Sequence, residues 1–260
     1  CLADCADRAA ATNAVYAELG PGRGTLAADA LRVLGPIAAH LVETSPSLRH
    51  AQQSRVPGAS FHNRIEDLPR VPLLLVANEF FDALPIRQRV GDEPRLIVLQ
   101  DDRLAFTASG LIVEDSPARS NAAAALAGHL AAHGGIALII DYGHAVSAPG
   151  DTLQAVRSHA FADPLANPGE QDLTAHVDFQ ALGEVARRAG ASVTLLATQG
   201  DWLTRLGIRQ RADALTRANP DRAECIALAL ARLTAPDQMG DLFKVMAIHH
   251  PDWPAPAGLQ

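Results

Sequence analysis

Two short runs in which every residue is apolar constrain the fold most strongly. Leu73–Ala77 and Ile136–Ile140 have the length of strands; a membrane helix needs roughly 20 apolar residues. A strand without polar alternation must be covered on both faces, which is typical of parallel sheets. Similar but weaker patterns predict further strands at Ala14–Leu19, Ala38–Val42 and Ala59–His62.

Helical patterns alternate with these strands. Thr25–Leu34 carries an apolar stripe, and we expect Thr25 to be its N-cap. Arg119–His133 is rich in alanine and stops at Gly134-Gly135, which suits a C-terminal helix cap. Strands that alternate with helices imply right-handed crossovers. The predicted fold class is therefore α/β, with a doubly wound, mostly parallel, Rossmann-like sheet whose ligands bind at the carboxyl ends of the strands.

Two segments interrupt this alternation and are predicted to be insertions, near residues 90–108 and 151–177. Arg95–Phe106 alternates like a hairpin with Asp101-Asp102 at its turn. Asp151–Val177 is long and rich in Pro, Gly and Asp, as functional or flexible loops are.

The chain then returns to regular patterns after the second insertion. Asp178 is expected to cap a helix that ends at Gly190. A strand at Ser192–Thr198, helices within Asp201–Leu233 and a strand at Leu242–His249 follow. We expect one domain over residues 1–250, and a Pro-rich tail, 251–260, with little order.

Composition narrows the classes of function. The chain has 260 residues, 48% of them hydrophobic, and a net charge of −7. This acidity argues against a nucleic-acid binder but suits a basic peptide as substrate. Three cysteines without metal-ligand spacing fit a reduced compartment, and we predict no metal site. The abundance of Ala and Arg beside a single lysine, Lys244, is typical of a bacterial chain from a GC-rich genome.

A glycine loop joins the first strand to the first helix, in the sequence Glu18-Leu19-Gly20-Pro21-Gly22-Arg23-Gly24. Its G-x-G-x-G spacing differs from the G-x-G-x-x-G of dinucleotide enzymes, whose helix N-terminus holds a pyrophosphate. S-adenosylmethionine has no phosphate. Glu18 is placed to meet its ammonium group, and the loop N–H groups are placed to meet its carboxylate. Glu43 ends the second strand and suits a ribose diol, although it would serve NAD equally well.

At this point the chain resembles the MidA family of S-adenosylmethionine-dependent methyltransferases. The resemblance rests on the glycine loop, continued through Thr25-Leu26, and on four later blocks that occur in the same order as in the family. The first of these four blocks is the most specific. They are Asn78-Glu79-Phe80-Phe81-Asp82-Ala83-Leu84-Pro85, Ile139-Ile140-Asp141-Tyr142-Gly143, Asp172-Leu173-Thr174-Ala175-His176-Val177-Asp178-Phe179 and Met239-Gly240-Asp241-Leu242-Phe243-Lys244-Val245.

The resemblance implies a class I methyltransferase fold with a seven-stranded sheet and inserted segments. It implies S-adenosylmethionine as cofactor, held by Glu18, Gly20, Pro21, Gly22, Gly24, Thr25, Glu43 and Asn78. It also implies a protein substrate methylated on arginine, as in the family's mitochondrial complex I assembly factor. Family members usually carry a substantial region before the glycine loop that contributes to both clefts; here Cys1–Val15 precede the loop strand.

The block after the fourth strand supplies the catalytic candidates Asn78, Glu79 and Asp82. Asn78 is expected where the sheet opens towards the transferred methyl group, and its amide both donates and accepts. A guanidinium is a flat fork of donors that pairs best with carboxylates. Two acids at this corner therefore suit an arginine acceptor. The alternative is that Glu79 caps a helix and Asp82 is solvated.

The remaining candidates lie on other segments. Asp141 and Tyr142 follow the fifth strand and are expected, with Asp172, to contact substrate. His176 is a candidate base or substrate contact, although a lone histidine is more often structural.

Three hypotheses follow from these observations. The first is a methyltransferase acting on a protein arginine, with a subunit of respiratory complex I as a possible substrate. The second is a non-catalytic assembly or chaperone module that binds S-adenosylmethionine and recognises a partner through Asp151–Val177. The third is an NAD-dependent oxidoreductase. A bacterial chain of this kind is expected in the cytoplasm, and a eukaryotic one in the mitochondrial matrix.

Overall fold

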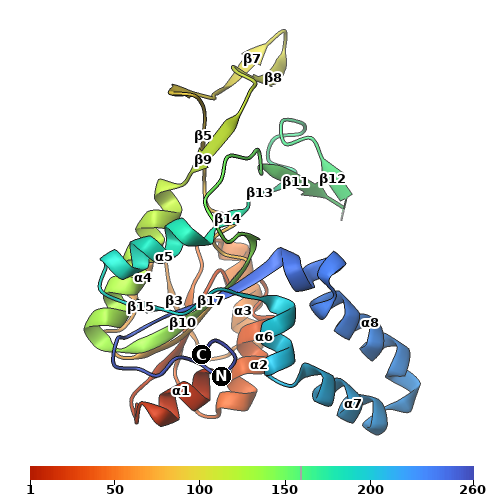
Figure 1. Ribbon diagram of the computed structural model, residues 1–260. Helices are drawn as coiled ribbons and strands as arrows, with labels where there is room; N and C mark the ends of the chain where they lie inside the picture. Colours follow the sequence, from red (N-terminus) through yellow and green to blue (C-terminus); the bar gives the residue numbers. More distant parts are fainter. Residues whose placement is uncertain (159) are drawn as a thin grey trace.

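The computed structural model describes residues 1–158 and 160–260 and is built around one central sheet (Figure 1). The sheet order is β15-β17-β10-β4-β1-β2-β3, with β16 also paired to β17 and β14 to β10. Its strands are β1 (Val15–Leu19), β2 (Ala39–Val42), β3 (Ser60–His62), β4 (Leu73–Asn78), β10 (Gly135–His144), β14 (Val177–Asp178), β15 (Ser192–Val193), β16 (Ala197–Thr198) and β17 (Phe243–His249).

The order confirms the predicted doubly wound topology. Strands β3, β2, β1, β4 and β10 pair in parallel, whereas β17 runs antiparallel between β10 and β15. The dinucleotide-binding order places successive parallel strands from the centre outward without such a reversed strand. The sheet therefore has the class I methyltransferase arrangement expected from the resemblance.

Helices cover both faces of the sheet (Figure 1). They are α1 (Leu2–Arg8), α2 (Thr25–Leu34), α3 (Pro46–Arg55), α4 (Pro117–His133), α5 (Phe179–Arg188), α6 (Gln199–Arg205), α7 (Ile208–Ala218) and α8 (Ala223–Thr234), with short turns at Ile65–Asp67, Pro220–Arg222 and Pro236–Gly240.

Strand β4 shows why an unbroken apolar run was needed. Leu73, Leu75 and Ala77 belong to the core beneath α4 and α5. Leu74 and Val76 belong to the opposite core, which α1, α2 and α6 cover. Since successive side chains of a strand point to opposite faces, a strand between two cores has no polar position.

Both predicted insertions form small sheets that project from one end of the central sheet (Figure 1). The first contains β5 (Arg87–Val90), β6 (Glu93–Pro94) and β9 (Ile112–Asp115), extended by the expected hairpin of β7 (Ile97–Gln100) and β8 (Arg103–Phe106). Positive φ angles of 47° and 59° at Asp101 and Asp102 make its turn. The second contains β11 (Gln154–Arg157), β12 (Ala160–Ala162) and β13 (Asp172–Thr174), where the sequence predicted only a loop.

Two other expectations are wrong. The strand predicted at Ser192–Thr198 is interrupted, because the Thr194 hydroxyl, rather than a backbone carbonyl, accepts the Ala247 amide. The tail after Pro251 is packed against the body: Leu259 is 3% exposed, and the Arg8 guanidinium donates to the Ala255 carbonyl at 2.8 Å. Because an apolar residue near its end fills a gap between helices, the tail is ordered despite its prolines.

Candidate active site

The glycine loop follows β1, and its backbone adopts conformations that favour glycine at three positions. Gly20, Gly22 and Gly24 have φ of 58°, 53° and 76°, a region that L side chains rarely adopt. A Cβ on Gly20 would lie 3.2 Å from the Phe80 ring, whereas a Cβ on Gly22 would meet no atom within 4 Å. Gly22 therefore borders open space, as a backbone that a ligand approaches closely should.

Two predicted loop residues take roles different from those expected. Thr25 is the first residue of α2 and not its N-cap, which is Gly24 with no capping side chain. The Thr25 hydroxyl is instead 3.0 Å from a guanidinium nitrogen of Arg55 and accepts its hydrogen bond. Pro21 is buried, and its carbonyl accepts the Gly24 amide at 2.8 Å. Both residues therefore shape the loop in this structure.

Glu18 is a buried carboxyl group at the end of β1. It is 3% exposed, and its Oε2 accepts a 2.7 Å hydrogen bond from the Tyr16 hydroxyl. Burial raises the pKa of Glu18 to about 7, although the Tyr16 hydrogen bond opposes the shift. A carboxyl group held between its charged and neutral forms is ready to pair with a cation, and an ammonium group is the cation that the sequence predicts here.

Glu43 and Gln52 connect the loop to the end of β2. Glu43 Oε1 accepts the Ser45 amide at 2.8 Å, and its Oε2 lies 3.4 Å from Gln52 Nε2. The same Nε2 donates to the Gly22 carbonyl at 2.7 Å. Gln52 is fully buried and its Oε1 has no partner among the described residues. Sequence reasoning missed Gln52, because one glutamine in a polar helix carries no signal.

A cavity of about 350 Å³ opens beside this group. It is lined by Gly20, Val42, Glu43, Thr44, Asn63, Arg64, Ile65, Glu66, Phe80, Leu84, Asn121, Ala122 and Ala125. A ribose diol suits the Glu43 carboxylate, and a flat base suits apolar walls flanked by an amide. Open space at Gly22 and the acid at the end of β2 therefore fit the nucleoside and amino-acid parts of S-adenosylmethionine.

The loop after β4 brings the predicted catalytic residues to the next corner of the sheet. Asn78 ends β4, and its Nδ2 donates to Glu79 Oε1 at 3.2 Å. Glu79 has a φ of 50°, an uncommon value for a residue other than glycine, and its amide bonds the Ile140 carbonyl at 2.9 Å. Backbone conformations of this kind cluster at functional sites, where they fix the direction of a side chain. Glu79 does not cap a helix, because the next helix along the chain is α4, which begins at Pro117 and is capped by Ser116.

Asp82 and Asp141 are two buried acids near Glu79, and they differ in their hydrogen-bond partners. Asp141 is fully buried, and its carboxylate accepts the amides of Phe81, Asp82 and Tyr142 at 3.0–3.2 Å. Its oxygens are thus used by backbone, and we assign it a positioning role instead of the predicted contact with substrate. Asp82 is 4% exposed, but its Oδ1 has no partner among the described residues. Burial raises the pKa of both groups.

Arg119 clamps this corner together from α4. Its guanidinium donates to four backbone carbonyls, those of Phe81 and Asp82 on one segment and of Ala175 and His176 on another, at 2.6–3.2 Å. The side chain is buried, and burial lowers its pKa while the carboxylates of Asp141 and Asp82 raise it. Sequence reasoning missed Arg119, since its partners are main-chain atoms distant in sequence.

Tyr142, Asp172 and His176 complete the corner. The Tyr142 ring packs edge-on against the His176 imidazole at 5.7 Å between centroids. Burial lowers the pKa of His176, so the ring is neutral at neutral pH. Asp172 is exposed, and its charge contributes to the raised pKa of both Glu79 and Asp82. The structure thus brings Glu79 and Asp82 close to Asp172, which follows Asp82 by 90 residues in the sequence.

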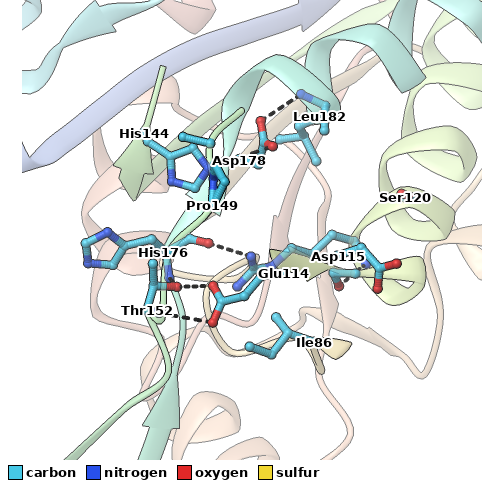
Figure 2. Close-up of a pocket in the computed structure, with 15 residues that line it drawn as sticks. Ile86, Glu114, Asp115, Ser120, His144, Pro149, Thr152, His176, Asp178 and Leu182 are labelled. Atoms are coloured by element: carbon cyan, nitrogen blue, oxygen red, sulfur yellow. Dashed lines mark hydrogen bonds and ion pairs between the residues drawn. The ribbon is translucent and has the colours of Figure 1, made fainter. Parts of the chain in front are cut away.

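A second cavity, of about 290 Å³, has Glu114, Thr152, His176 and Arg119 among the residues that line it, and Figure 2 labels the first three. The Thr152 amide and hydroxyl donate to Glu114 at 3.0 and 2.5 Å, and the His176 carbonyl accepts from Arg119. The His176 ring points away from Glu114 (Figure 2). Its imidazole therefore faces Tyr142, whereas its backbone supports the wall of this second cavity.

Comparison with known proteins places the chain in a family. Residues 5–102 and 93–197 match the family model described as "Putative S-adenosyl-L-methionine-dependent methyltransferase". The chain belongs to this methyltransferase family. Its donor is named in that description, and membership argues against the nicotinamide alternative, as the antiparallel β17 does.

The similar curated proteins are mitochondrial. The Drosophila melanogaster protein arginine methyltransferase NDUFAF7 homolog is 33% identical, over 89% of this chain and 66% of its own length. The Xenopus tropicalis protein arginine methyltransferase NDUFAF7 is 32% identical, over 89% and 67%. The chain therefore spans about two thirds of the length of these relatives.

A solved structure is similar over the whole chain. A Burkholderia thailandensis protein bound to S-adenosylhomocysteine has 25% identity and a TM-score of 0.83, covering 100% of this chain and 75% of its own. The similarity confirms the predicted class I methyltransferase fold. Within residues 1–158 and 160–260, no helix is long and apolar enough to cross a membrane.

Proposed function

We propose that this chain transfers a methyl group from S-adenosylmethionine to an arginine side chain of a protein. One observation carries the choice of acceptor: the buried Asp82 Oδ1 lacks a partner, beside the acids Glu79 and Asp172. Buried polar atoms are normally satisfied, and we propose that the acceptor supplies the donor for this atom when it binds at the exposed acids Glu79 and Asp172. A guanidinium supplies several donors and a positive charge that relieves the repulsion among the acids.

The cofactor side is assigned to the glycine loop and its partners. We propose that Glu18 pairs with the ammonium group, that the loop of Gly20, Gly22 and Gly24 holds the carboxylate, and that Glu43 binds the ribose diol. The cofactor supplies a methyl group on an already activated sulfonium, so the protein needs no nucleophile of its own. Asn78, between the two sides, orients the Glu79 carboxylate through its 3.2 Å hydrogen bond.

The acceptor must lose a proton for its nitrogen to attack. Glu79 is exposed as a residue, but partial loss of water around its carboxyl group, together with the neighbouring acids, raises its pKa and makes the carboxylate a stronger base than an ordinary glutamate. We propose that Glu79 accepts the proton at a carboxylate oxygen, while Asp82 and Asp172 hold the guanidinium in place. Tyr142 and His176 pack at 5.7 Å and form one wall of the acceptor site. Alignment of donor and acceptor accounts for most of the catalysis.

The arginine activity in the names of the mitochondrial relatives supports this acceptor. A subunit of respiratory complex I is the first substrate that we propose, on the resemblance to the MidA family. For a bacterial chain with three unpaired cysteines, we propose the cytoplasm as its location. For a eukaryotic one, the mitochondrial matrix is the corresponding compartment.

The first test is calorimetric titration with S-adenosylhomocysteine, with NAD as the control ligand, followed by transfer of a labelled methyl group to arginine-containing proteins. Wild type is expected to bind the first ligand and not the second. Glu79→Gln should bind S-adenosylhomocysteine normally but lose at least about 100-fold in transfer rate, as removal of a general base does. Binding without transfer in the wild type would instead support the non-catalytic module.

A further inference from the structure

The sheet β12-β11-β13 has two faces, and its register assigns residues to them. Val156 pairs with Phe161 on one side and with Asp172 on the other. Residues directly opposite in a ladder point to the same face, so these three side chains share one face. Gln154 and its partner Thr174 lie two residues along their strands and share it as well. We refer to this face as the platform.

One end of the platform is part of the candidate active site. Gln154 Nε2 lies 3.3 Å from Thr174 Oγ1, and both side chains act on the Tyr142 hydroxyl so as to lower its pKa, against the larger effect of burial. Ala175, which directly follows β13, donates its amide to the Asp82 carbonyl at 3.1 Å, and Asp172 contributes to the raised pKa of Glu79. The platform therefore begins at the acids and leads away from them across β13, β11 and β12.

The other end of the platform is apolar and uncovered. Phe161 is 82% exposed, and Val156 beside it is half-buried. A phenylalanine this exposed, next to another apolar side chain, is typical of an interaction site. On the opposite face Ala155 is fully buried, and its partner Leu173 is 47% exposed, so the largest exposed apolar side chain of this sheet is Phe161.

Charge indicates what the platform would bind. Residues 151–178 contain five carboxylates and one arginine. That arginine, Arg157, is on the opposite face by its register and pairs with Glu170 at 2.8 Å. Asp172 is thus the charged residue of the platform, and Glu79 stands next to it. A partner with a cationic group followed by an apolar group matches this order of charge and hydrophobicity.

We propose that the platform binds the part of the protein substrate that flanks the target arginine, with an apolar side chain of the substrate packed on Phe161. The proposal rests on the proposed function for its arginine, which enters between Asp172 and Glu79. The platform then selects the sequence around that arginine, which the acids alone do not.

The geometry sets the spacing in the substrate. Asp172 and Phe161 are separated by two strand spacings, about 10 Å. A segment in the polyproline II conformation advances about 3.1 Å per residue with three residues per turn, so positions three apart lie on one side about 9 Å apart. The preferred substrate therefore carries an apolar residue about three positions from its arginine.

Peptide binding tests this spacing without requiring catalysis. Synthetic, fluorescently labelled peptides would carry one arginine in a Gly/Ser background, with a single phenylalanine moved from one to six positions away on either side. Fluorescence anisotropy with the full chain, with and without S-adenosylhomocysteine, would give each Kd. The tightest binding is expected at three positions, by about tenfold over the peptide without phenylalanine. Equal affinity at all positions, or no peptide bound, would overturn the proposal.

Variants on the two faces of the same sheet provide the matched control. Phe161→Ser should abolish the roughly tenfold preference for the phenylalanine peptide. Leu173→Ser should keep it, because Leu173 is 47% exposed but pairs with Ala155 on the opposite face. If both variants lose this preference equally, the proposal that the platform binds the substrate is wrong. Calorimetry with S-adenosylhomocysteine on each variant separates this failure from failure of the cofactor site, which Phe161 does not contact.

Discussion

The proposed cofactor side and the proposed acceptor side of the site are assembled in different ways. Every side chain assigned to the first, apart from Asn78, lies between Glu18 and Gln52, in consecutive strands and helices. The second draws on segments from Asn78 to His176 that are held together by one buried guanidinium, Arg119. Local backbone conformation thus builds the first side, whereas long-range hydrogen bonds build the second. Substitutions on one side should therefore change the properties of that side and leave those of the other nearly unchanged.

Arg119→Met should have the largest effect, on the acceptor side. Four carbonyls would lose a charged donor in a buried place, so the free energy of unfolding should fall by about 3 kcal/mol or more. Urea unfolding checks this, with Arg188→Met as control, since the side chain of Arg188 is 69% exposed. At a urea concentration where the variant stays folded, its affinity for S-adenosylhomocysteine should remain within about threefold of wild type. A large loss of affinity would mean that the two sides are not independent.

Gly22→Ala should affect the cofactor side, by about thirtyfold in S-adenosylhomocysteine affinity (about 2 kcal/mol). Gly91→Ala is the matched control, because Gly91 also has a positive φ, 61°, and open space around it. Both variants should lose about 1 kcal/mol of stability from backbone strain. Only Gly22→Ala should lose affinity in calorimetry. If Gly91→Ala weakens binding equally, strain and not ligand contact explains the effect.

The pH dependence of binding should reveal Glu18. Its folded pKa of about 7 lies above its ordinary 4.5, so the folded protein without ligand holds the proton between these values. Stability without ligand should therefore fall as pH rises from about 4.5 through 7. A bound ammonium group favours the carboxylate, so affinity for S-adenosylhomocysteine should be about tenfold higher at pH 7.5 than at pH 5.5. Glu18→Gln should show a flat profile; an unchanged slope in this variant would assign the titration elsewhere.

Gln52→Met should have the smallest effect, because it keeps the side-chain volume and removes only the link between Gly22 and Glu43. We expect about fivefold weaker binding of S-adenosylhomocysteine, equal to about one hydrogen bond. Gln210→Met on α7 serves as a control outside the site. Unchanged affinity in Gln52→Met would show that the loop holds its conformation without the glutamine.

The accuracy of the sequence predictions follows the same division. The strands around β1, β4 and β10 and the helix caps at Asp178 and Gly134 were predicted correctly, because apolar periodicity and capping are local properties. The β12-β11-β13 sheet was missed, since short strands paired across a long turn leave almost no local pattern. The packed tail was missed because its order comes from contacts of residues such as Leu259 with distant helices.

The sequence by itself determined the class of sheet, the glycine loop and the family to which the chain belongs. These features depend on which residues follow one another, since an apolar strand, a tight turn and a helix start are each encoded within a few positions. Only the tertiary structure decided that Asp141 binds backbone amides, that Arg119 joins the segments of Phe81 and Ala175, and that Phe161 and Asp172 share one face. Burial and hydrogen bonding between distant segments set these roles, and no local pattern records them.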